Sequence, residues 1–156
     1  MQLSVPHWHQ IGDGFCLPAC VEMVLASLSA QHSQVDIAHA LGTKPNIGTP
    51  FSAITQLASR IRALHRTNVY LHETGEPEDL ERALHSGVPP ILRVLTGQLP
   101  YWAENTPHAV ILVGLENGIA TVNDPAFDQP QKVPFGDLCL AWDDGGNTYA
   151  LITQQP

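Results

Sequence analysis

Apolar residues in the first half of the chain recur at intervals of three and four, the spacing that places side chains on one face of a helix. In residues 16–28 they stand at positions 16, 19, 20, 23, 24 and 28, which predicts a helix with a buried face. The same pattern predicts three more helices, at Gln34–Leu41, at residues 51–62 and at Pro77–His85. Ser33 is suited to begin the first of these three and Gly42 to end it.

The second half of the chain has a different pattern, in which short apolar and β-branched runs are separated by turn residues. Strands are predicted at residues 88–95, 108–115, 119–123, 131–135 and 148–153, with a short helix near residues 137–142. We therefore expect an α+β fold in which the N-terminal helices come first and pack on a mostly antiparallel sheet. Residues 96–107 form a long aromatic loop before a strand, which makes this loop a candidate lid or binding loop.

Composition narrows the class of protein. The chain has 156 residues, of which 44% are hydrophobic, and this fits one globular domain over residues 1–156. The net charge of −8 argues against a nucleic-acid partner, because nucleic acids select basic surfaces. No apolar run is long enough to span a membrane and the N-terminus lacks the pattern of a signal peptide, so we expect no membrane insertion and a cytoplasmic location. Three cysteines do not form a disulfide scaffold, which agrees with a reducing compartment.

The stretch GDGFCLPAC places Cys16 at the start of the first predicted helix, directly after a turn at Asp13 and Gly14. The free N–H groups and the dipole of a helix N-terminus stabilise a thiolate. A thiol in that position is a candidate nucleophile, provided that a histidine and an orienting acceptor lie near it in the fold.

His108 has the context that such a partner needs. It opens the apolar strand HAVILVGL, and Asp124 follows the next predicted strand. Antiparallel pairing would return Asp124 to His108, where a carboxylate can accept the imidazole N–H. Gln10 lies six residues before Cys16, across a turn that contains glycine, and can aim its amide at the same point as the Cys16 N–H. The sequence therefore predicts a catalytic site made of Gln10, Cys16, His108 and Asp124.

Structural explanations compete with some functional ones. Cys16 can also be a buried structural thiol, because free cysteine is among the most buried residue types. Cys20, one turn later on the same face, and Cys139 are expected to lie in the core. His7 and His9 share a strand face and could form a metal pair, but the sequence offers no third ligand nearby. We therefore expect neither a metal site nor an organic cofactor.

Several segments resemble the bacteriocin-processing type of cysteine peptidase and its stand-alone bacterial relatives, which belong to the papain-like clan. The likeness rests on Q…C-x-P-A, HAVILVG and NDP, and extends through GVPPILRV to the tail VPFGDLCLAWDDGGNTYALI. It implies a papain-like fold and cleavage of peptides, often after small residues, by a site that matches Gln10, Cys16, His108 and Asp124. Leu17 departs from the family, which usually has glycine after the nucleophile, and a larger side chain there could narrow the cleft.

Three functions are compatible with this sequence. The first is hydrolysis of peptide bonds through a thioester on the cysteine. The second uses the same thioester for acyl transfer or for hydrolysis of a small non-protein amide. The third is a binding module of the same fold that captures a peptide without cutting it. The expected partner is thus a peptide or a small amide.

Overall fold

The structure of the chain, a computed structural model, describes residues 1–156. Its helices are α1 (Cys16–Ser27), α2 (Gln34–Leu41), α3 (Leu57–Arg60), α4 (Pro77–His85), α5 (Phe135–Asp144) and the short 3-10 helices η1 (Phe51–Gln56), η2 (Arg62–Leu64) and η3 (Thr96–Gln98). Its strands are β1 (Thr67–His72), β2 (Ile91–Leu95), β3 (Pro107–Glu116), β4 (Ile119–Asn123), β5 (Gln131–Pro134) and β6 (Tyr149–Gln154). None of the helices is both long and apolar enough to cross a membrane.

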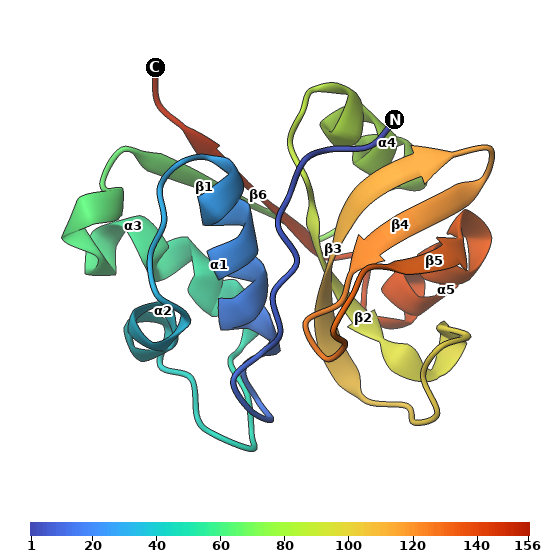
Figure 1. The fold of residues 1–156 in the computed structure, drawn as a ribbon, viewed down its shortest axis with the longest axis horizontal. Helices are drawn as coiled ribbons and strands as arrows, with labels where there is room; N and C mark the ends of the chain where they lie inside the picture. Colours follow the sequence, from blue (N-terminus) through green and yellow to red (C-terminus); the bar gives the residue numbers. More distant parts are fainter.

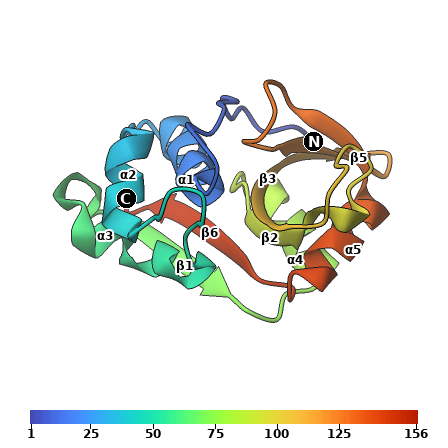
Figure 2. The same ribbon diagram turned by 90° about the horizontal axis from the view of Figure 1, so that it is seen from below.

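The six strands form one antiparallel sheet in the order β1-β6-β2-β3-β4-β5. Helices α1, α2 and α3 lie on one side of the N-terminal segment, and β3, β4, β5 and α5 lie on the other (Figure 1). Seen from below, β6 runs from the side of α1 and α2 toward α4 and α5, and so connects the two halves (Figure 2). The predicted α+β fold, with N-terminal helices on an antiparallel sheet, is confirmed.

Strand β3 separates two hydrophobic cores. Ala109, Ile111 and Val113 face the core that contains α1 and α2, whereas Val110 and Leu112 face the core that contains α4 and α5. Side chains alternate along a strand, so a strand that is covered on both faces must be apolar at every position. This double burial explains the uninterrupted apolar run that predicted the strand.

Helix α2 has the boundaries that the sequence predicted. The Ser33 side chain accepts a hydrogen bond from the Asp36 N–H, and Gly42 adopts a left-handed conformation at the C-terminus. Helix α1 begins at Cys16 as predicted and ends at Ser27, one residue before the predicted end.

The predicted helix at residues 51–62 is wrong, because the structure breaks this segment into η1, α3 and η2. Ile61 is extended between the last two. The Thr55 hydroxyl donates to the Ser52 carbonyl and the Ser59 hydroxyl to the Gln56 carbonyl. Serine and threonine side chains that bond nearby carbonyls in this way compete with regular helical hydrogen bonding.

Strand β1 was not predicted, so the sheet begins earlier in the chain than the sequence analysis placed it. β1 pairs with β6, from Thr67 opposite Gln154 to His72 opposite Tyr149. Val69 and Leu71 pack on the core of α1 and α2. The short alternation of these two apolar residues with polar ones was the available signal, but the pairing partner lies more than 75 residues away in the sequence.

Candidate active site

Cys16 is the first residue of α1, and no side chain caps this end of the helix. Because Cys16 lies in the first turn, its backbone N–H has no acceptor within the helix. The chain enters the helix through Gly14, whose φ of +89° favours glycine, and a Cβ there would lie 3.0 Å from backbone atoms of Lys44, Asn46 and Gly48. The Asn46 N–H also donates to the Asp13 carbonyl at 2.8 Å. The turn that presents the thiol is thus supported by the loop between α2 and η1.

His108, at the start of β3, lies between Cys16 and Asp124. Its Nε2 donates to Asp124 Oδ1 at 2.6 Å, and His108 lines the same cleft as Cys16. The side chains of His108 and Asp124 are 5% and 0% exposed, so water does not screen this contact. Antiparallel pairing of β3 with β4, which ends at Asn123, returns Asp124 to the histidine. The structure thus brings together three of the four residues that the sequence singled out.

Proton affinities in this group follow from burial and charge. Burial alone lowers the pKa of His108, but its hydrogen bond to Asp124, its interaction with Cys16 and the charges of both outweigh burial and raise the pKa from 6.5 to about 9. Burial raises the pKa of Asp124, but its hydrogen bond to His108 and the imidazolium charge outweigh burial and leave the pKa below its ordinary value. An ionised Asp124 beside a protonated His108 is therefore the stable state near neutral pH.

Both oxygens of Asp124 are saturated with hydrogen bonds. Oδ1 accepts from His108 and, at 3.0 Å, from the Ala126 N–H. Oδ2 accepts from the Tyr101 hydroxyl at 2.9 Å and from Trp102 Nε1 at 2.8 Å. Tyr101 and Trp102 belong to the loop at residues 96–107, which the sequence analysis described as a lid or binding loop and did not connect with Asp124. Two aromatic residues with polar tips in that loop were the only sequence signal for these contacts.

Gln10 lines the same cleft as Cys16 and His108. Its Nε2 donates to the Gly12 carbonyl at 3.0 Å, and its buried Oε1 has no hydrogen-bond partner. An amide nitrogen carries two hydrogens, so one remains for another acceptor. The structure places Gln10 at the cleft, but it shows no hydrogen bond from its amide toward Cys16.

The loop after Asp124 holds the N-terminal segment that carries Gln10. The Gln10 N–H donates to the Pro125 carbonyl at 2.8 Å, and His7 Nε2 donates to the Phe127 carbonyl at 2.7 Å. Asn123 donates to the Pro6 carbonyl at 3.2 Å. Residues 123–127 therefore bond both to the histidine through Asp124 and to the segment on the opposite side of the cleft.

The cleft has a volume of about 500 Å³ and is open to solvent along loops from both halves of the molecule. Ile47 and Trp102 contribute apolar surface to its walls, and Ile47 is 81% exposed. Leu17 borders the cleft but is only 2% exposed and packs in the core with α1 and α2. The expectation that Leu17 could narrow the cleft therefore has little support, because its side chain points mainly into the protein.

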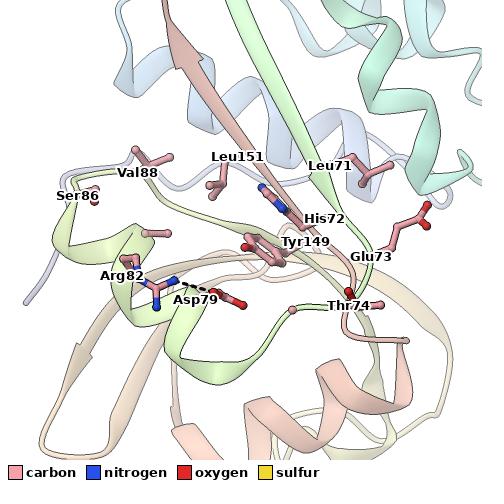
Figure 3. A pocket seen from close by; sticks show the side chains of 12 residues that line it. Leu71, His72, Glu73, Thr74, Asp79, Arg82, Ser86, Val88, Tyr149 and Leu151 are labelled. Carbon is pink, nitrogen blue, oxygen red and sulfur yellow. Dashed lines mark hydrogen bonds and ion pairs between the residues drawn. The ribbon is translucent and has the colours of Figure 1, made fainter.

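A larger cavity, of about 660 Å³, lies between α4 and the ends of β1 and β6 (Figure 3). Asp79 and Arg82 form an ion pair of 2.7 Å in its wall, and the His72 ring stacks on Tyr149. These four side chains thus already have partners within the wall, and the cavity contains no cysteine. The chemistry of a thiol nucleophile belongs to the smaller cleft.

The other two cysteines differ from Cys16. Cys20 is fully buried and its thiol donates to the Ala109 carbonyl at 3.4 Å, while burial raises its pKa well above the ordinary value. Cys139 is only half-buried, so it lies at the edge of the core rather than inside it. Burial and the charges of Glu81 and Glu78 raise its pKa to about 11. No group of three histidine, cysteine or acidic side chains could hold a metal ion.

Three solved structures with a similar fold are described as peptidases or peptidase domains. A protein from Bacillus anthracis assigned as a C39-like peptidase superimposes with a TM-score of 0.79 at 15% identity, over 97% of this chain and 96% of its own. A double glycine motif protease from an AMS/PCAT transporter, in complex with its leader peptide, gives a TM-score of 0.74 at 19% identity, over 99% and 94%.

A third similar structure is the peptidase domain of Streptococcus ComA, a bifunctional ABC transporter involved in quorum sensing. It superimposes with a TM-score of 0.71 at 14% identity, over 96% of this chain and 98% of its own. No curated protein sequence matches the chain significantly. The sequence model of one family matches residues 2–150, which is nearly the whole chain. The protein therefore belongs to the Peptidase_C39 like family.

Proposed function

We propose that this protein is a cysteine peptidase in which Cys16 is the nucleophile, His108 the proton carrier and Asp124 the group that orients the imidazole. The observation that carries the proposal is the position of the His108 ring, which donates to the buried Asp124 carboxylate and lines the same cleft as Cys16. Membership of a peptidase-like family and the peptidase neighbours support the same reaction class.

The reaction has two stages. The Cys16 thiolate forms a bond to the substrate carbonyl carbon, and the carbonyl electron pair moves to oxygen, where the Cys16 N–H and the free hydrogen of Gln10 Nε2 stabilise the charge. As the C–N bond breaks, the His108 imidazolium gives its proton to the leaving amine, and a thioester remains on Cys16. His108 then takes a proton from water, whose oxygen attacks the thioester, and the acid and the thiolate are released.

A peptide is the substrate that the cleft fits best. The cleft is an open channel between two halves of the molecule, with apolar surface from Ile47 and Trp102 on its walls. An extended chain can lie in such a channel, whereas small molecules are usually enclosed by deeper pockets. One structural neighbour is a protease in complex with a leader peptide, which supports peptides as the class of substrate.

The test compares hydrolysis of a peptide mixture by the wild-type protein and by Cys16→Ala and Cys20→Ala. Cys16→Ala should lose hydrolysis and keep its fold. Cys20→Ala is the matched control one helical turn away, and it should keep hydrolysis while it loses about 1–2 kcal/mol of stability. Equal loss of activity in both variants would contradict the roles given to the two cysteines.

Isotope labelling separates hydrolysis from acyl transfer, and a Gln10 variant tests the oxyanion hole. In water enriched in oxygen-18, hydrolysis places one heavy oxygen in the new carboxylate, whereas acyl transfer to an amine places none. Gln10→Ala should lower kcat by about 100- to 1000-fold if Gln10 holds the oxyanion. A wild-type protein that binds peptides but releases no product would favour the non-catalytic binding module.

A further inference from the structure

Three aromatic side chains near Asp124, those of Tyr101, Trp102 and Phe127, contact one another. We call this cluster the aromatic clamp. The Phe127 ring meets the rings of Tyr101 and Trp102 edge-on, with centroids 5.2 and 5.5 Å apart. Trp102 also meets the His108 ring edge-on at 5.0 Å. Edge-to-face contacts of this kind hold rings in fixed orientations, so the polar tips of Tyr101 and Trp102 stay directed at Asp124.

The two oxygens of Asp124 have different hydrogen-bond partners. Tyr101 and Trp102 donate to Oδ2, which leaves Oδ1 for His108 and the Ala126 N–H. Rotation of the carboxylate would break four hydrogen bonds to an ion that is fully buried. Hydrogen bonds to a buried charge are among the strongest in proteins, and a buried charge without them is costly.

We propose that Tyr101 and Trp102 are positioning residues, whose donors keep the Asp124 carboxylate ionised and aimed at His108, so that the loop at residues 96–107 serves the catalytic group as well as the cleft. This inference rests on the proposed function, because positioning matters only if His108 acts on Cys16. It differs from a lid, since the loop acts through contacts that are present without substrate.

The protonation of Asp124 is the quantity that separates positioning from support of the fold. The titratable groups that face Asp124 are His108 of β3, Tyr101 of the loop and Cys20 of α1. Burial raises the pKa of both Tyr101 and Cys20, so both stay neutral in acid. The hydrogen bond from Trp102 helps to lower the pKa of Asp124. Removal of the clamp donors should therefore raise the pKa of Asp124 and move the acid limb of activity to higher pH.

The experiment measures kcat and KM against pH for the full chain and for Tyr101→Phe, Trp102→Phe and the double variant. Each substitution removes one donor and keeps the ring. Tyr101 does not line the cleft, so its variant should lose about tenfold in kcat with KM nearly unchanged. Tyr149→Phe is the matched control, since Tyr149 is a buried tyrosine that packs on Trp142 and lies away from the cleft.

A second readout does not depend on peptide hydrolysis. Alkylation of Cys16 by iodoacetamide at pH 5 should be about tenfold slower in the double variant than in the wild type, and unchanged in Tyr149→Phe. If the wild type cleaves no peptide but its Cys16 is alkylated faster than that of the double variant, the peptidase proposal fails and the positioning role of Tyr101 and Trp102 is supported. If activity falls evenly at every pH, with the acid limb and the alkylation rate unchanged, Tyr101 and Trp102 only support the fold and the clamp is refuted.

Discussion

The charge of Asp124 should set the pH at which His108 loses its proton. The pKa of His108 lies at about 9 instead of 6.5, although burial alone would lower it. The difference corresponds to about 3 kcal/mol in favour of the protonated ring. Asp124→Asn keeps the size of the side chain and removes its charge. Burial, which lowers the pKa of His108, is then opposed by a weaker interaction at this position.

The expected change has a definite sign. Loss of an adjacent opposite charge should lower the pKa of His108 by about 1 to 3 pH units. At pH 8 the wild-type ring is then mostly protonated, whereas half or more of the variant rings are neutral. Because the proposed reaction starts from an imidazolium that protonates the leaving amine, the basic limb of kcat/KM should move to lower pH by the same amount.

Nitrogen NMR of the imidazole ring measures this titration directly, in the wild type and in Asp124→Asn. Asp128→Asn is the matched control, because Asp128 lies four residues later and its side chain is 95% exposed. That variant should leave the titration of His108 unchanged. A ring that still titrates near pH 9 in Asp124→Asn would refute the reasoning, since the charge of Asp124 would then not be what holds the proton.

Three further predictions follow from burial and backbone geometry. Iodoacetamide at pH 6 should modify Cys16 in the folded protein and Cys20 only after unfolding, as read by peptide mapping, because Cys20 is fully buried and its pKa is raised. Gly14→Ala should lower the free energy of unfolding by about 1–3 kcal/mol more than Gly118→Ala, because both glycines have positive φ but only Gly14 has backbone atoms 3.0 Å from its absent Cβ; equal losses in denaturant titrations would contradict this. Leu17→Gly should cost about 2–5 kcal/mol of stability while peptide turnover per folded molecule stays similar, because Leu17 is only 2% exposed; a large gain in turnover would show that Leu17 does narrow the cleft.

Local patterns in the sequence were sufficient for features whose causes are local. The cap residue Ser33 and the terminator Gly42 define α2 through contacts within a few residues. The β3–β4 hairpin was predictable because its strands are separated only by the turn Asn117-Gly118, and that pairing brings His108 to Asp124.

Features that depend on distant partners were beyond the sequence pattern. Strand β1 is stabilised by pairing with β6 near the end of the chain. The hydrogen bonds from Tyr101 and Trp102 to Asp124 span more than 20 residues and depend on how the loop folds over the carboxylate. Gln10 was assigned its role from its spacing to Cys16 and from the family resemblance, and neither fixes the direction of an amide that also bonds to Gly12.

The place of β6 in the sheet has a consequence for the order of events during synthesis. β6 is the last strand in the chain, yet it lies between β1 and β2 and connects the side of α1 with the side of β3. Cys16 therefore leaves the ribosome early, but the strand that joins β1 to β2, and so completes the sheet beneath α1, becomes available only when residues 149–154 emerge. We expect a nascent chain to carry an unactivated thiol until residues 149–154 have emerged, so that reactivity at Cys16 appears in step with completion of the sheet.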